Sequence, residues 1–307
     1  MLEDKRYWIW FSLIKNLGIR RKKKLLEIYQ NPKVIYGLKR KELTKISGIG
    51  EQTVDNILDV ETKILVDKHI DYLCKNNIDI ISISDDDYPE NLKLIYDSPI
   101  SLYIKGNKKI LNDKKIGIIG CRQASDYGKK AAMYFGYNLS KIGVNIISGM
   151  AKGVDSYSHI GNCKALKEKC YSQNDNYKHV DNVNNCGKPI AVVGNGLDIV
   201  YPSENKKLEE EIINLGGCII SEYPIGTKPQ KMHFPARNRI ISGMSDGILV
   251  IEAKEKSGTL ITVDFALEQG KDVYVVPGNI NSINSVGTNE LIKQGARLVT
   301  NYREIEV

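Results

Sequence analysis

The stretch HFPARNR places Arg237 and Arg239 on either side of Asn238, directly before an apolar helical run and a strand. A guanidinium is permanently charged and can hold a phosphate through two parallel hydrogen bonds. If a helix begins within this stretch, residues two apart point to nearly opposite sides. We therefore expect one arginine to face an anionic ligand and the other to be tied to an acidic residue such as Glu222 or Glu252. The alternative is an exposed charged turn.

Three other motifs place small residues between an apolar run and a helical stretch: GIIGCRQASDYG, NIISGMAKGVDSYSH and AKEKSGTLITVD. Backbone N–H groups at a helix start attract anions, and a neighbouring cation strengthens that attraction. Each motif therefore predicts a phosphate contact, although ordinary helix capping would explain each one alone. The candidate residues are Gly120, Cys121 and Arg122 in the first motif, Ser148, Gly149, Lys152 and Gly153 in the second, and Ser257, Gly258 and Thr259 in the third.

The same motifs offer little for catalysis, metal binding or a cofactor. Asp155 is placed to cap the helix that follows it, and His159 has no evident nucleophile or acidic partner, so we expect no catalytic residue. The glycines of the first motif do not fit GxGxxG, so a dinucleotide site is not expected. Cys163, Cys170, His179 and Cys186 share one segment, but their spacing matches no usual zinc pattern, so no metal is expected either.

From about residue 115 to 307, short β-branched runs alternate with helical stretches. This alternation predicts an α/β fold, namely an extended Rossmann-like parallel or mixed sheet with helices on both faces. The carboxyl ends of parallel strands meet at one edge, where such sheets bind ligands, so the motifs above should converge there. The expected strands are KIGIIG, VNIIS, PIAVVG, CIISE, GILVIEA, DVYVVPG and RLVTN. The Asn-rich residues 170–188 interrupt the rhythm and predict a surface insertion.

Residues 1–75 show apolar positions at helical spacing and predict a small all-helical domain, which residues 76–114 link to the sheet. The motif LTKISGIGEQTVDNIL resembles a helix-hairpin-helix, whose turn offers N–H groups to a phosphate, although a plain turn between helices explains it equally well. Residues 1–45 carry thirteen Lys or Arg against four Asp or Glu, while the rest of the chain is close to neutral. Charge therefore points to an anionic partner mainly at this end.

Neither a signal peptide nor an apolar run of membrane-spanning length is evident, which predicts a cytoplasmic protein that does not engage the membrane. The cysteines form no CxxC pair and are expected to be reduced thiols.

Seven motifs in sequence order resemble the DNA processing protein A family (DprA, also called Smf). They are DDDYPENLKLIYDSPISLYIKG, GIIGCRQASDYG, ISGMAKGVDSYSH, IAVVGNGLDIVYPSEN, ISEYPIGTKPQKMHFPARNRIISGMSD, VIEAKEKSGTLITVDFALEQG and VPGNINSINSVGTNELIKQGA. The resemblance implies an extended Rossmann-like domain after a small helical domain of the SAM or helix-hairpin-helix kind. It also implies a homodimer that binds and protects single-stranded DNA during natural transformation and recombination, helps to load the RecA recombinase, and is not an enzyme.

The resemblance assigns the family's Gly-Ser-Arg pocket to Gly120, Cys121 and Arg122, where cysteine replaces the serine and removes a good hydroxyl donor. It assigns the family's DNA-contacting lysine to Lys152. The Phe-Pro-x-Arg-Asn-Arg motif is complete, with Phe234 at its start. The chain ends soon after the last expected strand, so we expect no carboxyl-terminal winged helix, and DNA binding should rest on residues 115–307 with help from the basic amino terminus.

Two alternatives use the same phosphate contacts for a small nucleotide. One is a nucleotide-binding sensor with a Rossmann-like fold. The other is a nucleotide phosphoribohydrolase, whose PGGxGTxxE motif resembles the run that begins at Lys256. In this sequence Thr262 stands where the catalytic glutamate is expected, so the general acid/base group is missing. The sequence therefore disfavours the phosphoribohydrolase, while a nucleotide sensor stays open as the alternative to a DNA-binding protein.

Overall fold

The computed structural model describes residues 2–171 and 186–307. The surface insertion predicted at residues 170–188 lies almost entirely outside the described residues, as does His179. Within the described ranges, no three His, Cys, Asp or Glu side chains come close enough together to hold a metal ion. In that same part of the chain, none of the helices has the length and apolar composition that crossing a membrane requires.

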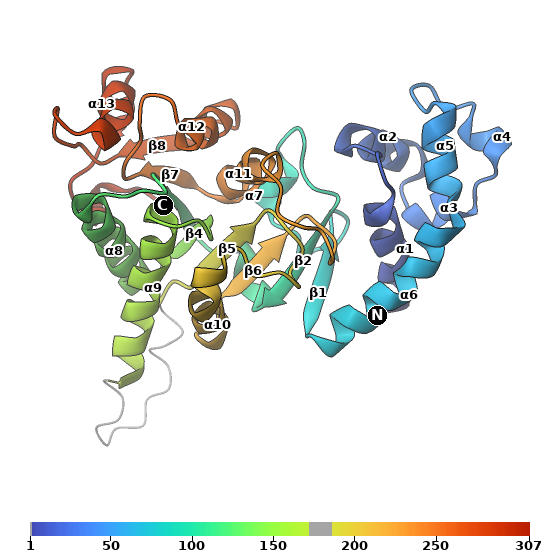
Figure 1. Ribbon diagram of the computed structural model, residues 1–307, viewed down its shortest axis with the longest axis horizontal. Coiled ribbons are helices and arrows are strands. Elements are labelled where there is room, and N and C mark those ends of the chain that lie inside the picture. Colours follow the sequence, from blue (N-terminus) through green and yellow to red (C-terminus); the bar gives the residue numbers. More distant parts are fainter. Residues whose placement is uncertain (1, 172–185) are drawn as a thin grey trace.

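The amino-terminal region is helical, as its apolar spacing predicts (Figure 1). Trp10 and Phe11 are fully buried, and Trp10 packs edge-on against Tyr36 with ring centroids 5.0 Å apart. Asn31 and Asp59 cap two of the helices by accepting hydrogen bonds from backbone N–H groups. The helices are α1 (Leu2–Leu13), α2 (Ile19–Tyr29), α3 (Pro32–Gly37), α4 (Arg40–Leu43), α5 (Glu51–Leu58) and α6 (Val60–Lys75).

The rest of the described chain is built on a nine-stranded sheet with the order β1-β2-β6-β5-β4-β3-β7-β8-β9. β2 pairs antiparallel with β1 and β6, and all other neighbouring strands are parallel. The strands are β1 (Ile78–Ser82), β2 (Ser101–Gly106), β3 (Lys115–Ile119), β4 (Asn145–Gly149), β5 (Pro189–Val193), β6 (Cys218–Ser221), β7 (Gly247–Val250), β8 (Asp272–Val275) and β9 (Arg297–Leu298). The seven strands predicted from apolar runs are β3 to β9, so that prediction is confirmed.

The other two strands, β1 and β2, lie within residues 76–114, which the sequence predicts as a linker. They extend one edge of the sheet and meet the helical region there. The Tyr103 hydroxyl on β2 lies 2.6 Å from Ser12 Oγ on α1, and Lys5 Nζ lies 2.9 Å from a carboxylate oxygen of Asp85 after β1. The apolar core of the helical region continues into these strands, so the two parts share buried surface.

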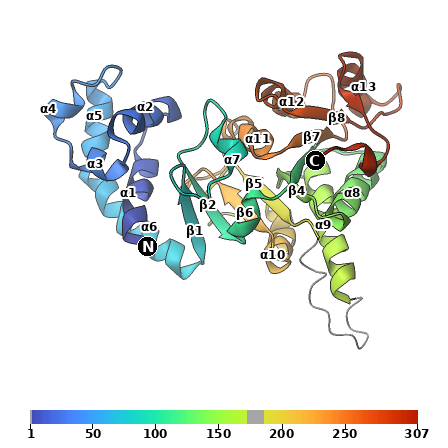
Figure 2. The same cartoon turned by 180° about the vertical axis from the view of Figure 1, so that it is seen from behind.

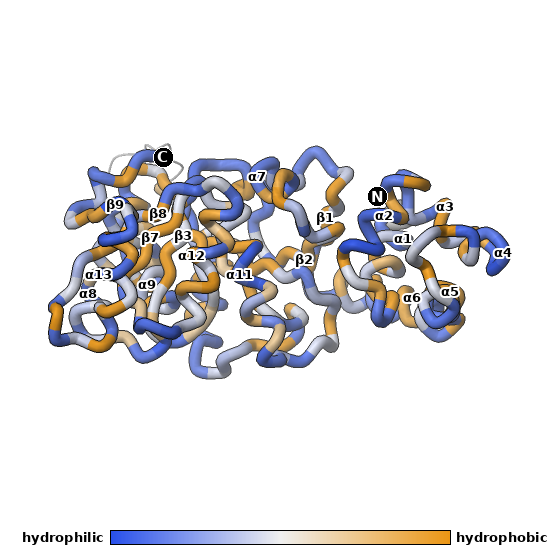
Figure 3. The backbone as a smooth tube through the Cα atoms, turned by 90° about the horizontal axis from the view of Figure 1, so that it is seen from above, coloured by the Kyte–Doolittle hydropathy of each residue, from blue (hydrophilic) through white to orange (hydrophobic). Residues whose placement is uncertain are grey.

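Helices cover both faces of the sheet (Figure 2). Phe135 and Leu139 of α8 pack against one face, while Ile240 and Met244 of α11 pack against the other with Val263 of α12. In Figure 3 the tube is hydrophobic along much of the strands and hydrophilic at the outlying α4. The Rossmann-like fold class is therefore confirmed. These helices are α7 (Glu90–Lys93), α8 (Asp126–Lys141), α9 (Val154–Tyr171), α10 (Lys206–Asn214), α11 (His233–Met244), α12 (Gly258–Glu268) and α13 (Val286–Lys293), with 3₁₀ helices η1 (Lys108–Asn112), η3 (Ser203–Asn205), η4 (Ile283–Ser285) and η5 (Tyr302–Glu304).

The order of the strands brings the predicted ligand contacts to one edge. The chain runs outward from β3 through β4 and β5 to β6, and then crosses back to β7 on the other side of β3. The loops after β3, β4, β5 and β7 therefore lie at the carboxyl edge around the point where the winding reverses, which is where open α/β sheets bind ligands.

Candidate functional site

A groove of about 710 Å³ lies at this carboxyl edge. Three of the predicted motifs meet in it although they are far apart in the sequence. Arg122 follows β3, Arg237 and Asn238 come from α11, and Ser257 precedes α12. Its lining residues are Ile119, Gly120, Cys121, Arg122, Gln123, Ala151, Asp155, Tyr201, Lys231, Phe234, Pro235, Arg237, Asn238, Ile241, Lys254, Ser257, Gly258, Thr259 and Thr262. We call this hollow the groove.

A smaller hollow of about 180 Å³ adjoins the groove and shares part of its wall. Its inner surface is mainly apolar, while Arg122, Lys152 and Arg237 supply positive charge. The lining residues are Arg122, Gln123, Met150, Ala151, Lys152, Val193, Gly194, Asn195, Tyr201, Pro202, Phe234 and Arg237. We call it the side cavity. An apolar wall with a few placed cations suits a ligand that has a flat apolar part and an anionic part.

Phe234 lies between the groove and the side cavity and belongs to an aromatic cluster. The ring of Tyr201 stacks on it with centroids 5.6 Å apart and an interplanar angle of 28°. The guanidinium carbon of Arg122 lies 5.1 Å from the centre of the Phe234 ring. His233, which precedes Phe234 in the sequence, stacks on the Tyr223 ring with ring centroids 4.2 Å apart. The cation–π contact places the exposed Arg122 over the aromatic surface without neutralising its charge.

Arg237 forms part of the floor of the groove and is 4% exposed. One terminal nitrogen donates to the carbonyl of Val192 on β5, and Nε has no hydrogen-bond partner among the described residues. Burial lowers the pKa of Arg237, and the nearby carboxylate of Asp155 opposes that change. A Cβ at Gly149 would lie 2.1 Å from this guanidinium and 2.4 Å from the Asp155 carboxylate, so only glycine fits beneath the two side chains.

Asp155 is the second residue of α9 and faces the groove, so it does not occupy the cap position that the sequence predicts for it. Burial raises its pKa to about 6, and the charges of Arg237 and Arg122 oppose this rise. His159, one turn later, is fully buried, and neither ring nitrogen has a partner among the described residues. Burial lowers the pKa of His159 to about 4, so the ring is neutral at neutral pH.

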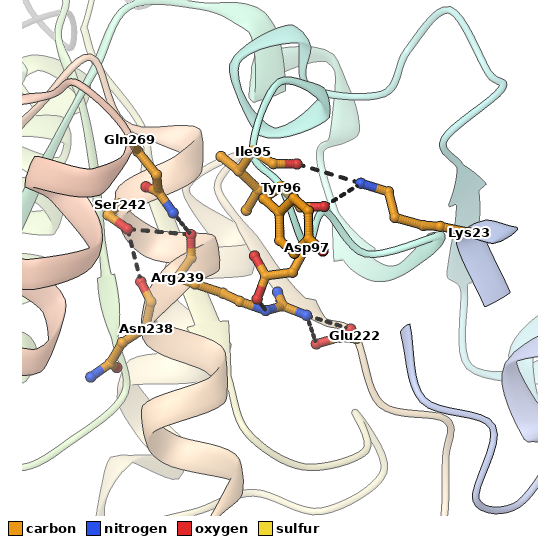
Figure 4. Close-up of polar contacts among 9 residues, drawn as sticks. All are labelled: Lys23, Ile95, Tyr96, Asp97, Glu222, Asn238, Arg239, Ser242 and Gln269. Carbon is orange, nitrogen blue, oxygen red and sulfur yellow. Dashed lines mark hydrogen bonds and ion pairs between the residues drawn. The ribbon is translucent and has the colours of Figure 1, made fainter. Parts of the chain in front are cut away.

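Arg239 points from α11 toward Glu222 and Asp97 (Figure 4) and is not among the residues that line the groove, as the helical spacing of the two arginines predicts. A terminal nitrogen lies 2.7 and 2.8 Å from the two carboxylate oxygens of Glu222, and Nε lies 3.0 Å from Asp97. The prediction that one arginine is tied to an acidic residue is therefore confirmed for Arg239 and Glu222. Asn238, between the arginines, lines the groove, and its amide nitrogen lies 3.4 Å from the carbonyl of Gly258.

Two more candidates shape the loops and do not line either hollow. The hydroxyl of Ser148 is fully buried and donates to the carbonyl of Ile118 at 2.6 Å, which joins β4 to β3. Gly153 has a φ of 80°, and a Cβ there would lie 2.3 Å from the carbonyl oxygen of Cys121. This glycine lets the loop before α9 turn tightly under the loop after β3. Ser148, Gly149 and Gly153 thus support the residues that line the groove.

The helix starts around the site are not equivalent. The carboxylate of Glu252 already occupies the start of α8, where it accepts hydrogen bonds from Ser125 N at 3.0 Å, from Ser125 Oγ and from Asn284 Nδ2 at 3.2 Å. In dinucleotide-binding Rossmann folds, the pyrophosphate binds at the helix start after the first strand. In this protein the Glu252 carboxylate fills the corresponding place at the start of α8. At α12 the Ser257 side chain makes no capping bond, so that start remains open to the groove.

The basic cluster at residues 20–24 lies largely at the junction between the helical region and the sheet. Lys23 donates to the carbonyls of Ile95 and Tyr96, as Figure 4 shows, and Arg20 lies over the Tyr96 ring at 5.5 Å. Lys22 donates to the carbonyl of Ser12 at 3.0 Å, and Lys24 donates to that of Ser47. These contacts give four of the five cations partners within the fold, although bonds to carbonyls and a contact with a ring leave their positive charges in place.

Several lining residues were not among the predicted candidates. Tyr201, Asn195 and Met150 line the side cavity, and Lys231 and Lys254 line the groove. The motif GNGLDIVYPSEN, which follows β5, contains Asn195 and Tyr201. Its position after a predicted strand is the feature of the sequence that could have identified these two residues.

The fold and the groove define a Rossmann-like protein that presents cations and an open helix start to an anionic ligand at the carboxyl edge of its sheet. A family model for the DNA recombination-mediator protein A matches residues 79–172 and 174–306, and the chain belongs to that family. The DNA processing protein DprA of Streptococcus pneumoniae is 42% identical over 224 residues, which are 73% of this chain and 72% of that protein. Protein Smf of Escherichia coli is 37% identical over 240 residues, 78% of this chain and 59% of that protein.

Two solved structures are also similar. The X-ray structure of DprA from Streptococcus pneumoniae has a TM-score of 0.77 and 35% identity, and the match covers 97% of this chain and 96% of that one. The structure of DNA processing protein A from Helicobacter pylori, described for its mode of binding single-stranded DNA, has a TM-score of 0.60 and 29% identity, covering 74% of this chain and 92% of that one. These similarities support the described fold over nearly its whole length.

Proposed function

We propose that this protein binds single-stranded DNA in the groove and acts as a recombination mediator. The observation that carries the proposal is the meeting of Arg122, Lys152 and Arg237, from three separate loops and helices, around one mainly apolar side cavity. Phosphates of a strand can bind the cations while a base enters the cavity or stacks beside Phe234. The Helicobacter pylori relative, which is described as binding single-stranded DNA, supports the same ligand.

The proposed binding depends little on base sequence. Phosphates bind to Arg122, Lys152 and the part of Arg237 that lines the two hollows, and the open start of α12 at Ser257 offers backbone N–H groups to a further phosphate. Every base has a flat face that can stack on an aromatic ring, and such stacking stabilises binding by about 1 to 3 kcal/mol per base. The protein should therefore bind strands of different sequence with similar affinity.

We further propose that the protein acts as a homodimer in the cytoplasm, protects incoming strands during natural transformation and helps to load RecA onto them. Membership of the recombination-mediator family supports this role. Sedimentation of the purified protein tests the dimer. Formation of RecA filaments on DNA covered by single-strand binding protein, with and without this protein, tests the loading. No acceleration of filament formation would contradict the loading role.

We also propose that the protein is not an enzyme, although one feature favours a hydrolytic alternative. Asp155 has a pKa raised to about 6 by burial and faces the groove, as a general acid would. Against hydrolysis, Thr262 lies where the phosphoribohydrolase glutamate is expected, and Glu252 fills the start of α8. We expect no free base after prolonged incubation with nucleoside monophosphates, as measured by chromatography. Base release that Asp155→Asn abolishes would establish the enzyme instead.

Fluorescence anisotropy with labelled oligo-dT, oligomers of mixed sequence and free nucleotides tests the binding function. Lys152→Glu should weaken binding to all oligomers alike and reduce the slope of log affinity against log salt by about 0.7, since one phosphate contact is lost. Lys68→Glu makes the same charge change at an exposed position on α6 and should leave the affinity nearly unchanged. Tight binding of free nucleotides without binding of the oligomers would contradict the proposal and favour a nucleotide sensor.

A further inference from the structure

The cations around the side cavity differ in whether a carboxylate already pairs with them. Lys152 Nζ forms an ion pair with Glu204 of η3, and the two side chains are 60% and 58% exposed. Arg122, by contrast, has no carboxylate within ion-pair distance in the described part of the chain and contacts the ring of Phe234. One of the proposed phosphate contacts is therefore occupied by an internal anion when no DNA is bound.

Several hydrogen bonds hold the two loops that carry this ion pair. Asn205, next to Glu204, donates from Nδ2 to the carbonyl of Met150 at 2.7 Å and to the hydroxyl of Ser156 at 2.9 Å. The Ser156 hydroxyl in turn donates to the carbonyl of Ala151 at 2.6 Å. The loop around Lys152 is thus tied to η3 through the Met150 carbonyl before the lysine and the Ser156 side chain after it, which keeps Glu204 within reach of the lysine. The hydrogen bond from Lys152 also lowers the pKa of Glu204, so the carboxylate stays charged at neutral pH.

We propose that Glu204 competes with the DNA phosphate for Lys152 and so limits the affinity of the groove for single-stranded DNA. This inference rests on the proposed DNA-binding function. A strand that binds Lys152 must displace Glu204 and leave its carboxylate close to a phosphate. Both side chains are exposed, so the strand can displace Glu204 without unfolding either loop. The same carboxylate shields Lys152 from single small anions, which have no further phosphates to place on Arg122 and Arg237.

The Glu204→Gln variant tests the competition. It keeps the shape of the side chain and removes the charge, so Lys152 becomes free for a phosphate. We expect the affinity for oligo-dT to rise about two- to fivefold at low salt, the range typical of an exposed ion pair. The slope of log affinity against log salt should steepen by less than about 0.7, because Lys152 already contacts a phosphate in the unaltered protein and the variant removes only the carboxylate beside it. Glu210→Gln, an exposed charge removal on α10, is the matched control and should change neither quantity.

A double-mutant cycle separates competition for Lys152 from general repulsion between Glu204 and DNA. If Glu204 acts through the lysine, then Glu204→Gln should have no effect in a Lys152→Gln background. An equal rise in affinity with and without Lys152, or a fall in affinity in Glu204→Gln alone, would overturn the inference while leaving the DNA-binding function intact. If the unaltered protein itself fails to bind oligo-dT, the proposed function fails, and this inference fails with it.

Discussion

Two arginines separated by one residue have different roles in this protein. Helical spacing alone predicts that Arg237 and Arg239 point to different sides, and the structure agrees. Which one faces the groove could not be predicted, because the answer depends on where the tertiary fold places their partners. Glu222 was a candidate partner, but Asp97 lies 142 positions before Arg239 and no local pattern indicates it. Helical geometry thus determines that the two arginines point to different sides. Contacts with residues distant in the sequence determine which arginine faces the groove.

Replacement of Arg239 by alanine should lower the free energy of unfolding and should change the groove little. The Arg239 side chain is 6% exposed, and its removal leaves Glu222 and Asp97 without their shared cation. Because these carboxylates are partly exposed, we expect a loss of about 2 kcal/mol in the free energy of unfolding, below the range for fully buried pairs. Urea denaturation measures this loss. Arg21→Ala, at an exposed position, is the control, and equal losses in both variants would refute the role of Arg239.

The carboxyl group of Asp155 should make DNA binding depend on pH. Its pKa is raised to about 6 by burial, and Arg122 and Arg237 lie nearby. A phosphate bound to these guanidiniums raises this pKa further, so binding takes up protons and the affinity for oligo-dT should fall about three- to tenfold as the pH rises from 5 to 7. The pKa of His159 is lowered to about 4, so this ring stays neutral over that range.

Binding measured across this pH range checks the role of Asp155. The Asp155→Asn variant should lose most of the pH dependence, because the group at this position can no longer titrate. A wild-type affinity that does not change between pH 5 and 7 would contradict the expectation, as would a variant that keeps the full dependence.

At the scale of elements, apolar runs predict β3 to β8 because parallel strands buried on both faces must be continuously apolar, while the exposed edge strand β9 was predicted from its run RLVTN. β1 and β2 escape this reasoning. They are antiparallel strands at one end of the sheet, and β2 meets the helical region through the contact between Tyr103 and Ser12. The motifs predict Arg122 and Arg237 in the groove, but Lys231 and Lys254 were not among the candidates, and Tyr201 enters through a turn that the tertiary fold brings over Phe234.

The contacts that α2 makes with the loop before β2 should stabilise that loop. Lys23 donates to the carbonyls of Ile95 and Tyr96, and Arg20 lies over the Tyr96 ring. In the double variant Arg20→Ala and Lys23→Ala, amide hydrogen exchange of residues 95–98 should increase several-fold, because local opening becomes easier. Exchange in β3 and β4 should not change. Unaltered exchange at residues 95–98 would show that other contacts, such as the ion pair of Asp97 with Arg239, hold this loop.

For the whole molecule, the positive excess of the sequence and the cations of the groove lie in different parts of the chain. Residues 1–45 carry most of the positive excess, yet many of their cations are used within the fold: Arg40 pairs with Glu51 and Asp55, and Arg6 pairs with Asp67. The groove lies in the nearly neutral remainder of the chain and depends on a few placed cations. Composition could not predict this, because the count of charges does not show which charges the protein itself neutralises.

The proposed dimer leads to a prediction about strand length. One groove with its side cavity offers Arg122, Lys152 and Arg237, so a short oligomer that occupies them should show a slope of about −2 in log affinity against log salt. When an oligomer is long enough to reach both grooves of a dimer, binding in the second groove becomes intramolecular. Across a length series of oligo-dT, the affinity should therefore rise abruptly at one length, and the slope should approach about −4 beyond it. Lys152→Glu should reduce the slope about twice as much for long strands as for short ones. A smooth rise in affinity with length and an unchanged slope would instead indicate that each strand uses a single groove.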